Sequence, residues 1–128
     1  MNARRLFFAL LQENHRILRH AGERLERIGP FHPDTVMRIL ATPLLPRLLA
    51  AFFRPSLRGT YCSMRPDMGS GRTEVDAYNG HLLRLAGSQP APINRAVLEM
   101  EARISMQRLE PSREHLRSLA ATLPRGVA

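Results

Sequence analysis

Residues 60–85, TYCSMRPDMGSGRTEVDAYNGHLLRL, join a polar loop to the predicted start of a helix. The loop carries small polar and thiol side chains and ends in a glycine-serine turn at 69–71. After this turn, residues recur at the three- and four-residue intervals of an amphipathic helix rather than the alternation of a strand. Thr73 and Asp76 have the spacing of a capping pair, with the acidic residue in the first turn, where a helix favours negative charge. The pattern therefore predicts a helix that begins beside a polar cluster.

Gly80 lies inside this predicted helix, where glycine costs about 1 kcal/mol relative to alanine. A group that approaches the backbone closely at this point would explain the glycine. Glu74 and Ser63 would then lie at the ends of two elements and face one gap. Ordinary helices also begin with a Thr-x-x-Asp pair ahead of an apolar pattern, so the spacing alone does not name a ligand.

Three short runs in the segment match a known family pattern: SMRPD at 63–67, GRTEVD at 71–76 and NG at 79–80. Together they resemble the signature of the C-terminal domain of ketopantoate reductase (2-dehydropantoate 2-reductase), which reads S-M-x-x-D, a short spacer, G-R-x-T-E-[IV]-D, two residues and N-G. The run at 71–76 departs from this signature because it is one residue shorter than the usual form. Downstream, PAPIN at 90–94 is similar to the P-x-P-x-N that precedes the family's next helix. The resemblance extends over residues 3–109 and implies an all-α, substrate-binding and dimer-forming domain.

The resemblance also implies a substrate site. Members of the family use NADPH to reduce the ketone of ketopantoate to pantoate, on the path to pantothenate and coenzyme A. Ser63 matches the serine that hydrogen-bonds the substrate carboxylate, and Glu74 matches the glutamate that helps to hold the substrate and the catalytic lysine. Thr60 stands where many members carry a substrate-binding asparagine. A hydroxyl donor and a carboxylate acceptor suit a small hydroxy acid.

Two parts of the family's chemistry are absent from the sequence. All 19 residues in the Lys+Arg count are arginine, and a guanidinium, which stays charged, cannot replace a lysine as proton donor. No Gly-x-Gly-x-x-Gly follows an apolar strand, and 128 residues leave no room for a nucleotide-binding domain. We therefore expect one helical domain of about five to seven helices over residues 1–123, followed by a frayed tail at 124–128. By itself, this domain should bind no cofactor and have no turnover.

Two cases remain open for such a domain. It is either a fragment or split product of a reductase that needs a separate nucleotide-binding chain, or a stand-alone remnant that binds a small 2-keto or 2-hydroxy acid or a protein. Domains of the family begin with an earlier helix, which carries the lysine, and this chain starts after it. The loss of a helix should uncover apolar surface on its neighbours, so we expect the chain to self-associate.

The formal net charge of +8 allows a different class of function. Arginine fields attract phosphates, so an arginine-rich helical module that binds nucleic acid or a protein partner is the alternative interpretation. Aromatic residues make up only 5% of the chain, there is no tryptophan, and no cluster interleaves rings with arginine as single-strand binders do. Nucleic acid is therefore not the expected partner.

The rest of the chain predicts further helices separated by proline and glycine. Residues 3–21 keep one face apolar at a period of about 3.6 residues, and Gly22 ends or bends this helix. Pro33 fits the first position of a short helix that stops before Pro43. Paired apolar residues over 44–53 indicate a wide apolar face, interpreted as core or subunit contact because the run is too short to span a bilayer.

Two more helices are predicted after the central segment. Gly87 is a plausible C-cap, and Asn94 is predicted to cap a helix whose apolar residues continue to Leu109. A last helix is predicted to start at Pro111 and to pack Leu116 and the apolar residues that follow it. No part of the sequence predicts a strand.

The histidines and the single cysteine indicate neither a metal site nor redox chemistry. His15 and His20 have no cysteine or acidic ligand at metal spacing, so they are interpreted as surface residues. Cys62 cannot form an internal disulfide, and without a histidine nearby it is interpreted as a small packed residue rather than a nucleophile. The sequence shows no signal peptide and no long apolar run, which predicts a cytoplasmic protein without a membrane segment.

Overall fold

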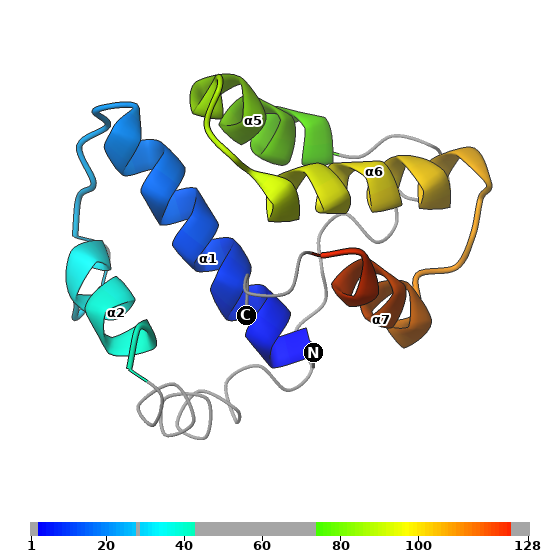
Figure 1. Cartoon of the computed structure of the whole chain (residues 1–128), viewed down its shortest axis with the longest axis horizontal. Helices are drawn as coiled ribbons and strands as arrows, with labels where there is room; N and C mark the ends of the chain where they lie inside the picture. Colours follow the sequence, from blue (N-terminus) through cyan, green and yellow to red (C-terminus); the bar gives the residue numbers. More distant parts are fainter. Residues whose placement is uncertain (1–2, 28, 43–73, 124–128) are drawn as a thin grey trace.

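A computed structural model describes residues 3–27, 29–42 and 74–123 of the chain. These residues form helices joined by turns, and no strand occurs among them, so the predicted all-α fold is confirmed (Figure 1). The helical segments in chain order are α1 (Ala3–His20), α2 (Pro33–Leu40), η1 (Asp76–Gly80), α5 (His81–Ala86), α6 (Pro92–Met106) and α7 (Arg113–Thr122).

The long helix α1 is the centre of the arrangement. It contacts α2, α5, α6 and α7, and Figure 1 shows α2 on one side of it with α5 and α6 on the other. Its apolar residues follow the predicted stripe, and Ile17 is completely buried. Burying such a side chain contributes roughly 1.5–3 kcal/mol. The helix ends as predicted, because Gly22 takes a positive φ of 77° that favours glycine.

Two apolar clusters pack against this helix at different levels. The first cluster lies between the N-terminal half of α1 and the helices α6 and α7, and consists of Leu6, Ala9, Ile93, Met100, Ile104, Leu119 and Leu123. The second lies between the C-terminal half of α1, α5 and the start of α6, and consists of Ile17, Ala86 and Ala91 with Leu82, Leu83 and Leu85 around them. Between these two clusters, α1 carries a buried charged residue, Glu13.

The short helix α2 begins at Pro33 and ends before Pro43, as predicted. Its N-cap is His32, whose Nδ1 accepts the backbone N–H of Asp34. Asp34 in turn hydrogen-bonds His15 of α1, with 2.7 Å between Oδ1 and Nε2. The interpretation of His15 as a surface residue is therefore only partly right, because its ring joins α2 to α1 and is partly buried. His20 is exposed, as expected.

The segment around Gly80 is helical as predicted, but not uniformly. Residues Asp76–Gly80 form a π-helical turn, and the α-helix α5 follows it to Ala86, where Gly87 ends it as predicted. Gly80 is buried, and a Cβ at this position would collide with the carboxylate of Asp76. The expected close approach to its backbone is therefore confirmed, and the approaching group comes from the preceding turn.

Four predictions about the last two helices are wrong. Asn94 does not cap α6, because the helix begins two residues earlier at Pro92 and buries the asparagine. The helix ends at Met106, so Leu109 lies beyond it. The last helix begins at Arg113 rather than Pro111, and Leu116 is exposed because only Leu119 and Leu123 face the core.

Several predicted features fall outside the described residues. They are Thr60, Cys62 and Ser63 of the expected site, the N-cap candidate Thr73, the apolar pairs at 44–53 and the tail at 124–128. In the part of the chain that the structure describes, no helix has the length and apolar character needed to cross a bilayer.

Candidate functional site

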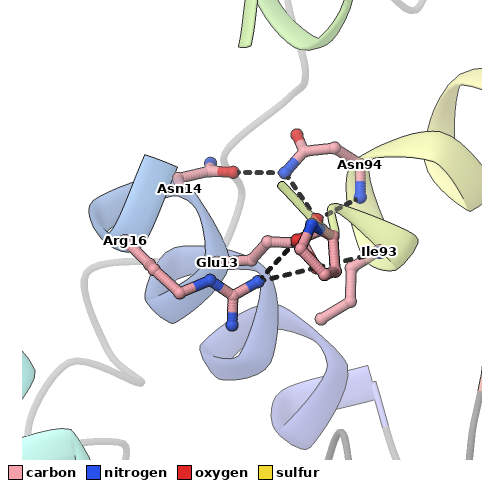
Figure 2. A network of polar contacts seen from close by, with 6 residues as sticks. Glu13, Asn14, Arg16, Ile93 and Asn94 are labelled. Carbon is pink, nitrogen blue, oxygen red and sulfur yellow. Dashed lines mark hydrogen bonds and ion pairs between the residues drawn. The ribbon is translucent and has the colours of Figure 1, made fainter. Parts of the chain in front are cut away.

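The most polar part of the interior surrounds Glu13 of α1, a residue that is only 3% exposed (Figure 2). It lies between the two apolar clusters and points at the first turn of α6. Its Oε2 accepts the backbone N–H of Ile93 at 3.1 Å, and its Oε1 accepts the backbone N–H of Asn94 at 2.7 Å. The carboxylate of one helix therefore binds the N-terminus of another, 80 residues further along the chain.

The local sequence of α6 explains why this carboxylate is needed. The first N–H groups of a helix have no partner within the helix, and a side chain at the N-cap usually accepts one of them. The N-cap here is Ala91, which has no polar side chain, so both buried N–H groups depend on an acceptor from elsewhere. Glu13 supplies that acceptor, and its negative charge also lies at the positive end of the helix dipole.

Asn94 extends this contact into a network of three helical segments. The residue is completely buried, and its Nδ2 donates to Glu13 Oε1 at 2.9 Å and to Asn14 Oδ1 at 2.7 Å. Its Oδ1 accepts the side-chain Nδ2–H of Asn79 in η1 at 2.9 Å. Because both acceptors lie on one side of the amide and the donor on the other, only one orientation of the Asn94 amide satisfies all three bonds.

Arg16 closes the network at the surface. Its Nη2 donates to the carbonyl oxygen of Pro90 at 2.9 Å and lies 3.9 Å from Glu13 Oε2. The guanidinium is more than half exposed, so its attraction to the carboxylate is screened by water and contributes little. Its role is to hold the chain that leads into α6.

The groups in this network stabilise the packing of helices and include no catalytic side chains. Both oxygens of Glu13 already accept backbone or amide N–H groups, and the surrounding groups are amides rather than acids, bases or nucleophiles. Among the described residues, no group of three or more histidine, cysteine or acidic side chains could hold a metal ion. The network therefore fixes the positions of α1, η1 and α6 relative to one another.

Glu74 is the one residue of the expected substrate site that the structure describes. It is exposed and immediately precedes the helical segment that contains η1. Its carbonyl oxygen accepts the backbone N–H of Tyr78 at 3.1 Å, which ties it to the first turn. Ser63 and Thr60 lie outside the described residues, so the gap expected between Ser63 and Glu74 stays a prediction.

Comparisons of the chain with protein-family models, with curated proteins and with solved structures give no match. The resemblance to ketopantoate reductase consequently rests on the sequence runs alone.

Glu13 is the central residue that sequence reasoning missed. The sequence does contain a signal for it, because residue 13 falls on the apolar stripe of α1 between Leu10 and Ile17, where a solvated glutamate is out of place. Asn14 and Asn79 also lie on the inward sides of their helical segments, where each hydrogen-bonds Asn94.

Proposed function

We propose that this chain is the C-terminal, substrate-binding domain of a ketopantoate reductase-like protein, which binds a small 2-keto or 2-hydroxy acid. The observation that carries the proposal is the set of sequence runs at 63–67, 71–76, 79–80 and 90–94 in the family's order. The reaction of the whole protein would be the NADPH-dependent reduction of 2-dehydropantoate to pantoate, in the cytoplasm.

Two features of the structure support the proposal. The described residues are all-α, as the family's C-terminal domain is expected to be. The asparagines of two separate runs, Asn79 and Asn94, hydrogen-bond each other across two elements. Residues that match the family pattern are thus the ones that join η1 to α6, and the neighbouring run at 71–76 includes Glu74, which is exposed to solvent.

The proposed roles follow from the side-chain chemistry. Ser63 and Thr60 would donate hydroxyl hydrogen bonds to the ligand carboxylate, and Glu74 would accept a hydrogen bond from the ligand hydroxyl. The sequence contains neither a lysine nor a dinucleotide-binding glycine turn, so the residues present do not fit NADPH and no hydride or proton transfer is assigned to this chain. A second chain would supply the lysine and the nucleotide-binding site, and this domain would bind the acid without turnover.

Calorimetric titration with ketopantoate and with pantoate tests the proposal. Wild type should bind at least one acid, and the double variant Ser63→Ala, Glu74→Ala should lose that binding. The double variant Glu99→Ala, Ser118→Ala makes the same chemical changes at exposed positions of α6 and α7 and should bind like wild type. The proposal would be refuted if neither acid gave binding heat, or if both double variants lost binding affinity equally.

Self-association is the second part of the proposed function. Large apolar side chains are exposed on several described elements, among them Phe7 at 55%, Tyr78 at 61% and Met106 at 80%. A homo-oligomer would cover part of this surface. Sedimentation analysis at micromolar concentration should give a mass above that of one chain, and a strictly monomeric mass would contradict self-association.

A further inference from the structure

Glu74 is linked to the buried network through only a few bonds. Its carbonyl accepts the N–H of Tyr78, and the next residue, Asn79, donates its side-chain N–H to Asn94. Asn94 is in turn held by the carboxylate of Glu13. The position of the exposed Glu74 is therefore connected to the core of the domain by the first turn of the segment and one hydrogen bond between side chains.

The direction of that hydrogen bond is set by the core. Both Nδ2 hydrogens of Asn94 are used by Glu13 and Asn14, so only its oxygen faces η1. Position 79 must consequently present a donor. A carboxylate of the same shape would place acceptor against acceptor and break the connection.

The π-helical turn gives the same region a special geometry. π-helical turns are rare and occur frequently at functional sites, because they change the direction in which side chains leave a helix. Gly80, which ends the turn, lets the Asp76 carboxylate lie over the backbone without a clash. This turn holds Asn79 against Asn94, while Glu74 lies exposed before its start.

We infer that Asn79 is a positioning residue, which holds the turn from Glu74 to Gly80 against α6 and thereby orients the Glu74 carboxylate for the ligand. The ligand half of this inference rests on the proposed function of Glu74. The structural half, that Asn79 orders the turn at Glu74, is independent of any ligand.

Amide hydrogen exchange measured by NMR tests the structural half. The variants Asn79→Asp and Asn79→Ala both remove the donor, the first with nearly unchanged shape and the second without an added charge. In both, exchange of the Tyr78 amide, which bonds Glu74, should become at least about fivefold faster, the factor expected for one lost hydrogen bond. Amides of α7 should not change relative to wild type.

Ile104→Val is the matched control, because it weakens the first apolar cluster without touching the network. It should accelerate α6 and α7 amides at least as much as the Tyr78 amide. If the Asn79 variants show this same uniform pattern, or leave the Tyr78 amide unchanged, Asn79 is only a packing residue and the inference is wrong.

Calorimetry with pantoate tests the ligand half. Asn79→Asp and Asn79→Ala should weaken pantoate binding at least about fivefold, while Ile104→Val leaves it unchanged. Wild-type protein that binds neither pantoate nor ketopantoate would refute the proposed function, whereas the Tyr78 exchange result would still decide the structural half. Wild-type affinity in both Asn79 variants would overturn the ligand half alone.

Discussion

The substitution Glu13→Gln tests whether the buried carboxylate holds α6 to α1. A glutamine has nearly the same volume, and its oxygen can take the place of Oε1 and keep both bonds to Asn94. Its NH₂ group must then face the backbone N–H of Ile93, which loses its acceptor. The change isolates charge and acceptor number from packing.

The expected loss follows from those bonds. A buried N–H without an acceptor costs about 1–3 kcal/mol, and each remaining bond weakens by about 1 kcal/mol when its acceptor loses its charge. Because these terms are not fully additive, we expect the free energy of unfolding to fall by about 3 kcal/mol. For a domain of this size, that loss should lower the melting temperature by about 10 °C.

Thermal and urea unfolding followed by circular dichroism at neutral pH measure this loss. Glu114→Gln is the matched control, since it makes the same chemical change in an ion pair with Arg117 in which both side chains are 73% exposed. Screening by water makes such pairs weak, so the control should change stability by less than about 0.5 kcal/mol. If the free energies of unfolding of Glu13→Gln and Glu114→Gln differ by less than about 0.5 kcal/mol, the Glu13 carboxylate does not hold α6 and the reasoning fails.

Two further predictions concern contacts that do not involve Glu13. Gly80→Ala should be more favourable in an Asp76→Ala background than in wild type, by about 1 kcal/mol in a double-mutant cycle of urea unfolding, because the added Cβ collides with the Asp76 carboxylate; additive effects would contradict this. The hydrogen bond from His15 holds the pKa of Asp34 below its ordinary value of 3.8, with help from the charges of Arg19, His32 and His15 and against the opposing effect of burial. Ionised Asp34 therefore stabilises the fold above that value, and its contribution is lost as the pH falls through the lower folded-state pKa. The stability advantage of wild type over Asp34→Asn should be present above pH 3.8 and shrink as the pH falls below it, and an advantage that persists or grows below that value would refute the assignment.

Local features of the fold could be predicted because their causes lie within a few residues of each other. The apolar stripe of α1 and the ends at Gly22, Pro33 and Gly87 follow from helix periodicity and from the backbone preferences of glycine and proline. The start of α6 was predicted wrongly because the prediction used only local residue types. Asn94 has the residue type of a cap, and only packing against α1 shows that the helix starts at Pro92 and that the acceptor comes from Glu13.

The contacts that hold the helices together could not be predicted in this way. Glu13 and Asn94 are 81 residues apart, and His15 and Asp34 are 19 apart, so no periodicity relates them. Asn79 of the π-helical turn likewise bonds Asn94, which lies 15 residues further along the chain in another helix. Sequence can suggest such a polar residue only where it interrupts an apolar face, as Glu13 does.

The sequence by itself determined that this protein is helical, where α2 begins, where α1, α2 and α5 end, and which runs resemble the ketopantoate reductase signature. These are properties of short stretches of chain, governed by periodicity and backbone preference. Only the tertiary structure decided that the asparagines of two of those runs face each other and that a glutamate from the first helix completes the start of α6. Those bonds form because buried N–H groups need acceptors, and the folded chain brings the acceptors to them from distant positions.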